Sequence, residues 1–257
     1  IDTSGDRAEA EAWVAQTFNL PGVSSQLAPE LASDPMLQRG TELWALGLWA
    51  EARSELDALH KLNRTNPAAL LQLAFHYQSI GINRSSVNSA TRLIYNTTIP
   101  VVDIPESILR LAYPMYFSDM FLPRAAEENL DPLLVAGLIR QESSYDPTVI
   151  SVVGARGLMQ FMPPTAQDMA EQLGYTDYEL DDLFRPIVSV DFGTHYLSSM
   201  RDYQGGSDVG ALLSYNAGPG AARVWLDQAG SDLERLYETI NYAETQLYLD
   251  LIYTNHY

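Results

Sequence analysis

The sequence of 257 residues contains no cysteine and only one lysine, Lys61. Without cysteine the chain forms no disulfide, which fits an exported protein that does not rely on them. No run of eighteen apolar residues occurs, so no transmembrane span is expected. The chain starts at Ile1 without a charged and then apolar leader, and we expect any export signal to lie upstream. The four histidines lack the spacing of metal ligands, so no metal site is expected.

Positive charge is also scarce. Lysine and arginine number 15 against 33 acidic residues, which gives a net charge of −18. Residues 101–257 carry most of this excess, with 23 acidic and 8 basic side chains. A nucleic-acid partner is excluded because it requires a basic surface, and attraction to anionic lipids is disfavoured for the same reason. Solubility is the simplest role for the charge.

One carboxylate stands at the end of an apolar segment. Asp131 followed by Pro132 predicts the start of a helix, since aspartate is a good N-cap and proline fits the first helical position. Apolar residues at spacings of three and four then share one face with Glu142. They are Val135, Leu138 and Ile139. This pattern predicts that Glu142 continues a buried stripe.

Burial gives such a carboxyl group a specific chemistry. Apolar surroundings disfavour the charged form and raise the pKa, so that the group can donate a proton near neutral pH. A lone glutamate near a helix C-terminus is more commonly an exposed residue without function. The glycine-rich turn and the amide of Gln160, which follow within twenty residues, favour a site for glycosidic bond cleavage.

Four motifs carry a resemblance to a known family. Glu-Ser-Ser-Tyr begins at Glu142, and Gly-Ala-Arg-Gly-Leu-Met-Gln-Phe-Met-Pro-Pro-Thr-Ala begins at Gly154. Tyr-Asn-Ala-Gly-Pro-Gly begins at Tyr215, and Glu-Thr begins at Glu244, followed by Tyr248. In this order, within residues 111–253, they resemble the soluble lytic murein transglycosylases. The resemblance implies an all-α chain whose catalytic domain has a goose-type lysozyme-like fold.

The resemblance also implies roles for single residues. Glu142 matches the catalytic acid of the family. The residues implied in substrate binding are Ser151, Gln160, Met162, Tyr215, Asn216, Glu244 and Tyr248. One departure is Gln246, which stands where the family often has arginine, so an ionic contact is in doubt there.

The implied reaction is the non-hydrolytic cleavage of peptidoglycan glycan strands between N-acetylmuramic acid and N-acetylglucosamine, which leaves 1,6-anhydro ends. It needs one carboxylate, as acid and then as base, and no cofactor. Asp146 is too close to Glu142 in sequence to face it across a cleft, and we expect it to share the helix end or turn. Two alternatives stay open: a hydrolytic lysozyme of the same fold, and a non-catalytic scaffold that binds the cell wall.

The first hundred residues predict helical hairpins. Gly47 and Gly81 lie 34 positions apart in similar settings, which is the tetratricopeptide period. Two units are too few to establish an array, so we expect hairpins of tetratricopeptide-like form in residues 1–100 and a catalytic domain in residues 101–257. The N-terminal helices offer a surface for a protein partner. No strand pattern of useful length occurs, and at most a small hairpin is expected.

Overall fold

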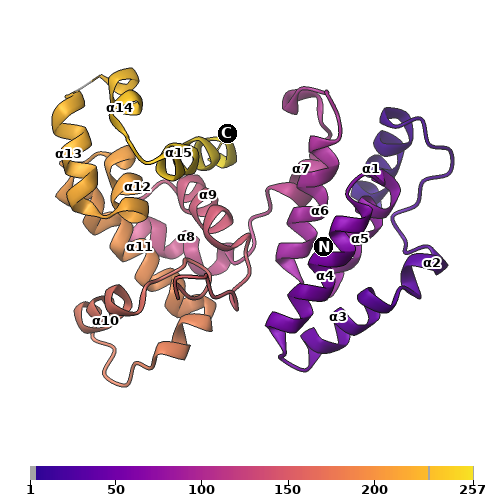
Figure 1. Ribbon diagram of the computed structural model, residues 1–257, viewed down its shortest axis with the longest axis horizontal. Coiled ribbons are helices and arrows are strands. Elements are labelled where there is room, and N and C mark those ends of the chain that lie inside the picture. The colour runs from indigo at the N-terminus through magenta and orange to yellow at the C-terminus, as the bar shows by residue number, and fades with distance from the viewer. Residues whose placement is uncertain (1–3, 231, 257) are drawn as a thin grey trace. The chain divides into compact units, whose positions relative to one another are not determined.

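The structure, a computed structural model, describes residues 4–230 and 232–256. In these ranges the regular elements are fifteen α-helices and two 3-10 helices, without a strand (Figure 1). The predicted all-α class is therefore confirmed. Two compact units share the chain, unit 1 in residues 1–116 and unit 2 in residues 117–257. None of the helices in the described ranges has the length and hydropathy of a membrane crossing.

Unit 1 consists of short helices joined by tight turns. Its elements are α1 (Ser4–Thr17), α2 (Pro29–Ala32), α3 (Pro35–Ala45), α4 (Trp49–Asn63), α5 (Pro67–Ser79), α6 (Asn83–Tyr95), η1 (Val101–Asp103) and α7 (Glu106–Ala112). Helices α3 and α4 pack as one pair, and α5 and α6 as another. Gly47 and Gly81 join the members of each pair, both with φ of 75°, a conformation that glycine adopts without strain. The hairpins and their 34-residue spacing are present, while their tetratricopeptide-like character stays a prediction.

The C-terminal limit of unit 1 follows from its core. Ile108 and Leu111 of α7 are buried against Ala10 of α1 and Leu70 of α5. Because α7 contributes its apolar face to this core, the division expected between residues 100 and 101 falls inside unit 1. The assignment of each part of the chain to a named domain stays a prediction.

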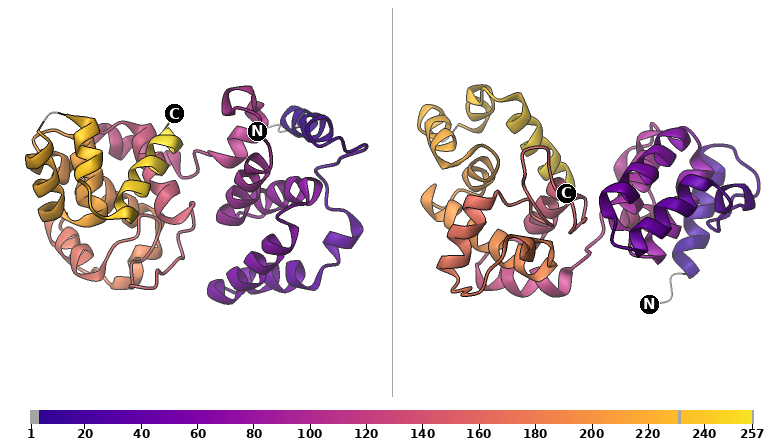
Figure 2. Two further views of the ribbon diagram at one scale, coloured as in Figure 1. Left: turned by 45° about the horizontal axis from the view of Figure 1, so that its top comes forward. Right: turned by 60° about the horizontal axis from the view of Figure 1, so that its bottom comes forward.

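Unit 2 is built around helix α9. Its elements are α8 (Ser118–Glu127), α9 (Pro132–Ser143), α10 (Pro163–Gln172), η2 (Leu180–Phe184), α11 (Pro186–Tyr203), α12 (Asp208–Ala217), α13 (Pro219–Ala229), α14 (Leu233–Thr239) and α15 (Ala243–His256). Helix α9 packs between α8 and α15, and α12 packs against α11, α13 and α15 (Figures 1 and 2). Helix α15 thus contacts both α9 and α12, which brings together residues more than a hundred positions apart.

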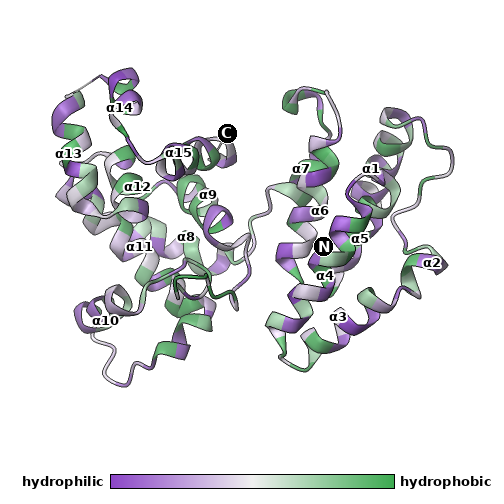
Figure 3. Cartoon of the chain, in the orientation of Figure 1, coloured by the Kyte–Doolittle hydropathy of each residue, from purple (hydrophilic) through white to green (hydrophobic). Residues whose placement is uncertain are grey.

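The predicted start of α9 is confirmed, since the Asp131 side chain accepts a hydrogen bond of 2.8 Å from the Leu133 N–H. The prediction of a single apolar stripe underestimates how much of the α9 surface is buried. Leu134 and Ala136 are buried together with the three stripe residues, so α9 is enclosed on most sides. Gly137 explains part of this burial, because a Cβ atom there would lie only 3.3 Å from the Ile252 carbonyl of α15. Hydrophobic residues accordingly run along α9 in Figure 3.

The chain reverses directly after α9. Ser144 and Tyr145 both have positive φ, of 51° and 63°, which is unusual for two consecutive residues other than glycine. The Tyr145 side chain is buried, and its hydroxyl donates to the Ala136 carbonyl at 3.1 Å. This contact fixes the reversed segment against α9. It leaves Glu142 at the helix end, where the loop of residues 146–162 begins.

The loop of residues 146–162 is folded by isolated bridges. Arg156 pairs with Ile150 on one side and with Phe161 on the other, which is all that exists of the expected small hairpin in the described chain. Gly157 has φ of 80°, and a Cβ atom there would lie 2.0 Å from the Leu183 carbonyl of η2. The loop and η2 therefore approach each other at a point that admits no side chain.

This approach predicts unequal effects of alanine at two glycines of the loop. Gly154 has φ of 91° but open space around its Cβ position, so Gly154→Ala adds only backbone strain of about 1–3 kcal/mol. Gly157→Ala adds similar strain and a clash with backbone, and should lower the free energy of unfolding by about 2 kcal/mol more. Urea unfolding of both variants measures the difference. Equal losses would show that the loop can move away from η2.

Candidate active site

The site is organised around Glu142 in the last turn of α9. The side chain is half-buried, so it remains accessible from one side. Its Oε1 atom accepts a hydrogen bond from the hydroxyl of Tyr248, a buried residue of α15. Asp146 lies in the following turn, where its carboxylate accepts bonds of 2.9 and 2.7 Å from the Thr148 N–H and hydroxyl. The expectation that Asp146 belongs to its own turn is confirmed.

The surroundings of Glu142 change its acidity. Burial raises the pKa of the carboxyl group from 4.5 to about 7, and the hydrogen bond from Tyr248 opposes this rise. Neither another carboxylate nor a cation of the described chain contributes to the shift. The raised pKa agrees with the expectation from the apolar helix. A substantial fraction of Glu142 is therefore protonated at neutral pH, as a proton donor must be.

Two tyrosines accompany Glu142. Tyr215 of α12 donates a hydrogen bond of 2.9 Å to the Met159 carbonyl, and its ring meets the Tyr196 ring edge-on at 5.4 Å. Burial and the negative charge of Glu142 hold the pKa of both Tyr215 and Tyr248 well above the usual value. Both hydroxyl groups therefore stay protonated and act as donors at any ordinary pH.

Gln160 and Ser151 shape the loop beside the acid. The Gln160 amide nitrogen donates to the carbonyls of Gly157 and Val149 at 2.8 and 3.3 Å. The Ser151 hydroxyl accepts the Ala155 N–H at 3.0 Å. These two residues, expected from the resemblance to line sugar subsites, thus make bonds that hold their own loop. Any contact they make with a sugar comes in addition to this structural role.

The outer side of the same loop is apolar and exposed. Met162, expected to touch sugar, lies directly before α10 and is 40% exposed. Val152 and Val153 are exposed at the tip. Met162 is thus accessible to a ligand, unlike Met159, which is fully buried.

Asn216 and Glu244 have different surroundings. The Asn216 side-chain oxygen accepts a hydrogen bond of 2.7 Å from the hydroxyl of Thr245, which connects α12 to α15. Glu244 is exposed in the first turn of α15, without a hydrogen bond or ion pair to any described residue. The structure therefore groups Glu142, Tyr215 and Tyr248 closely and leaves Glu244 free towards solvent.

Sequence reasoning assigns no role to Thr245 or Tyr196. Thr245 is only 2% exposed, and it begins the buried stripe of α15. The further members of that stripe are Tyr248, Leu249 and Ile252. A polar residue in register with three apolar ones at helical spacing is the signal that could have identified Thr245.

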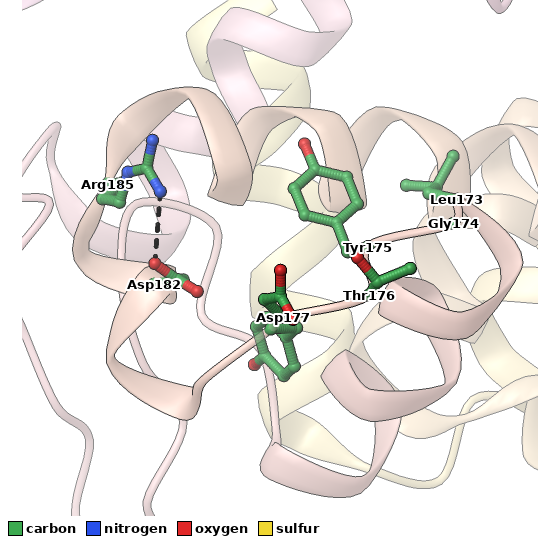
Figure 4. A pocket seen from close by; sticks show the side chains of 8 residues that line it. Leu173, Gly174, Tyr175, Thr176, Asp177, Asp182 and Arg185 are labelled. Atoms are coloured by element: carbon green, nitrogen blue, oxygen red, sulfur yellow. Dashed lines mark hydrogen bonds and ion pairs between the residues drawn. The ribbon is translucent and has the colours of Figure 1, made fainter.

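A separate pocket of about 420 Å³ lies at the segment between α10 and η2 (Figure 4). Arg185 in its wall forms an ion pair of 3.3 Å with Asp182. The residues around it are Leu173, Gly174, Tyr175, Thr176, Asp177, Tyr178, Asp182 and Arg185. None of the residues implied in substrate binding belongs to this pocket, so it is distinct from the Glu142 site.

Comparisons with known proteins agree with this geometry. Residues 119–237 match the family model described as transglycosylase SLT domain. The chain is 27% identical over 239 residues to the soluble lytic murein transglycosylase of Salmonella typhimurium, which covers 91% of this chain and 35% of that protein. The chain thus spans about a third of the length of the curated relatives it matches.

Solved structures show the same fold. The 70-kDa soluble lytic transglycosylase of Escherichia coli superposes with a TM-score of 0.73 at 25% identity, covering 98% of this chain and 43% of that one. An inactive mutant of the lytic transglycosylase Slt from Pseudomonas aeruginosa, in which a glutamate is replaced by glutamine, gives 0.71 at 25% identity over 94% and 39%. The expected lysozyme-like, all-α catalytic fold is confirmed. Residues 119–237 are thus similar to the transglycosylase SLT domain family.

Proposed function

We propose that this chain cleaves peptidoglycan glycan strands by lytic transglycosylation. The observation that carries the proposal is the single half-buried carboxyl group of Glu142, whose pKa of about 7 suits a group that first gives and then takes a proton. The names of the relatives support the substrate class. The glutamate-to-glutamine change in the inactive relative supports a glutamate as the essential group.

In the proposed reaction, protonated Glu142 gives its proton to the oxygen that links N-acetylmuramic acid to N-acetylglucosamine. The bond between this oxygen and the anomeric carbon breaks, and positive charge develops on the muramic sugar. Glu142, now ionised, removes the proton from the C6 hydroxyl of that sugar. The C6 oxygen bonds to the anomeric carbon and closes the 1,6-anhydro ring. Glu142 ends protonated again, and no water is consumed.

The neighbouring tyrosines suit this sequence of steps. Because Oε1 accepts the Tyr248 hydroxyl, Oε2 is the oxygen available to carry the transferable proton. The same bond stabilises the carboxylate that forms after the first step. We propose that Tyr215, Gln160 and Met162 contact the sugar beside Glu142.

Ser151, Asn216 and Glu244 complete the proposed subsites. Glu244 is the only one of these three whose side-chain polar atoms have no partner among the described residues. It is exposed and free to bind a sugar hydroxyl. The other two residues would contribute chiefly through the loop and helix that they fix.

The proposal extends to location and organisation. Since the proposed substrate is a cell-wall polymer, the protein would act after export, in the periplasm, the cell envelope or the extracellular space. The tetratricopeptide-like part would lie in residues 1–100 and the catalytic part within residues 101–257, of which residues 101–116 pack in unit 1. The N-terminal helices would serve a protein partner.

A two-carboxylate hydrolase would require a second carboxylate, about 5–5.5 Å from the acid if it acts as the nucleophile or about 6.5–9.5 Å if it activates water. Asp146 is committed to the turn at Thr148, and no other acidic group of the described chain affects the pKa of Glu142. Mass spectrometry of muropeptides separates the two reactions, because anhydro products are lighter than reducing-end products by one water. A non-catalytic scaffold would give no products.

Glu142→Gln should fold and lose activity by roughly a hundred- to ten-thousandfold or more, since one group supplies both proton transfers. Release of muropeptides from purified peptidoglycan measures the loss. Glu171→Gln is the matched control, because Glu171 is an exposed residue of α10 whose carboxylate bonds only to Gln167. Full turnover by Glu142→Gln would disprove the assignment.

The pH dependence of kcat/KM should show one descending limb. The free enzyme must hold the proton on Glu142, so activity falls as pH rises through about 7. A second essential carboxylate would add an acidic limb near pH 4. Initial rates between pH 3 and 9 with soluble glycan fragments provide the test, and a bell-shaped profile would favour the hydrolase.

The ionisation of Glu142 should also make the free energy of unfolding of the wild type depend on pH. Glu142→Gln should lack this contribution. The folded-state pKa is raised, so native protein binds more protons than unfolded chain between pH 4.5 and about 7. The contribution of protonated Glu142 is complete below pH 4.5 and is lost as pH rises through 7. From pH 4 to 8 the wild type should lose about 3 kcal/mol relative to Glu142→Gln. Urea unfolding at both pH values measures this, and parallel curves would contradict the burial of the acid.

A further inference from the structure

The hydrogen bond between Thr245 and Asn216 has a consequence for the acid. Thr245 is almost fully buried on the face of α15 that packs on the protein interior, where a hydroxyl group is costly unless it is bonded. Its hydroxyl donates to the Asn216 side chain at 2.7 Å. Valine would fill the same volume without a polar group. The bond is therefore the evident reason for a threonine here.

The two ends of this bond adjoin the two tyrosines of the site. Asn216 follows Tyr215 on α12, and Thr245 lies three residues before Tyr248 on the same buried face of α15. The bond therefore fixes the position of α15 along α12. That position decides whether the Tyr248 hydroxyl reaches Oε1 of Glu142.

The contacts between α15 and α9 hold the other end of α15. Gly137 faces the Ile252 carbonyl, and Arg140 donates to the Asn255 side chain. Both contacts lie on the C-terminal side of Tyr248. The N-terminal part of α15 is linked to α12 by Thr245 on its buried face, and the half-buried Gln246 amide links it to the Tyr237 carbonyl of α14 at 3.0 Å. Thr245 is thus the polar contact in the described chain that joins this end of α15 to the helix of Tyr215.

We infer that Thr245 and Asn216 are positioning residues, whose mutual hydrogen bond holds Tyr248 against Glu142. The inference rests on the proposed function for its meaning in catalysis. The dependence of the Tyr248–Glu142 hydrogen bond on Thr245 is a matter of geometry and does not rest on the proposed function. Asn216 then serves the reaction mainly through its side-chain oxygen.

The prediction concerns the ionisation of Glu142. The bond from Tyr248 lowers the pKa of Glu142, so Thr245→Val, which removes the bond between α15 and Asn216 of α12, should raise that pKa further. The other ionisable group that faces Glu142 is Tyr215 of α12, beside Tyr196 of α11, and both remain neutral over the range tested. The carbon-13 shift of the Glu142 carboxyl against pH reports the pKa, with Glu142→Gln identifying the signal.

Rates supply a second readout. Thr245→Val should lower kcat by about five- to tenfold, the value of one net hydrogen bond, with KM unchanged because Thr245 does not touch the sugar. Thr245→Ser keeps the hydroxyl and should restore both the rate and the titration. In a Tyr248→Phe background, Thr245→Val should cause no further change in the pKa of Glu142, since the bond it supports is already absent.

Thr254→Val is the matched control, because Thr254 is an exposed residue of α15 whose hydroxyl bonds only to the Asp250 carbonyl of its own helix. If Thr245→Val does not fold, Asn216→Ala removes the same hydrogen bond by deleting its acceptor, which belongs to a half-buried residue. A pKa of Glu142 that is unchanged or lowered in the variant that folds would overturn the inference. Because the carboxyl titration requires no turnover, it stays readable even if Glu142→Gln proves active and the proposed function fails.

Discussion

The arrangement of unit 2 depends on the burial of one carboxyl group at the end of a helix. A charged Glu142 is disfavoured among the atoms that enclose α9, and the only described group that stabilises the charge is the Tyr248 hydroxyl. These two effects oppose each other, and together they hold the pKa near neutrality. In the proposed reaction, such an acid would be protonated for the first step without being too weak to act as a base in the second. Helices α9 and α15 must meet closely for this balance to exist.

Other segments of the chain contribute to the position of Glu142 indirectly. The reversed segment at Ser144 and Tyr145 places Glu142 at the start of a loop instead of inside a continuing helix. Gly157 lets this loop lie against η2. Many of the polar groups around the site are consequently occupied with each other, and few are left for a ligand. The same enclosure that raises the pKa of Glu142 also limits the direction from which a glycan can approach.

Much of this could be predicted from local signals. Asp131 and Pro132 mark the start of α9 because capping depends on neighbouring residues alone, and the spacing of apolar residues locates Glu142 on a buried face. The extent of α9 burial could not be predicted this way, since it depends on α15, which comes a hundred residues later. The limit of unit 1 is similar, because only the packed structure shows that α7 completes the core around Leu70.

The roles of polar residues were the hardest to predict. The resemblance predicts that Gln160 and Ser151 lie beside a sugar, but it does not reveal that their side chains already bond to the loop. Thr245 shows the reverse case, a residue with no assigned role whose partner lies 29 positions away on another helix. Hydrogen bonds between distant residues leave no trace in local pattern. The direction of a polar side chain, and not its residue type, decides whether it is available to a ligand or bonds to other parts of the protein.

The two consecutive left-handed residues after α9 have a consequence for engineering. Ser144 and Tyr145 each hold a backbone conformation that glycine would adopt at lower energy, and the burial of Tyr145 maintains it. Glycine in place of Ser144 would relieve this local strain, yet it would also loosen the turn that fixes the orientation of Glu142. Stability and the proposed activity therefore make opposite demands on this turn. Selection of the protein for heat resistance alone should first reduce the proposed activity here.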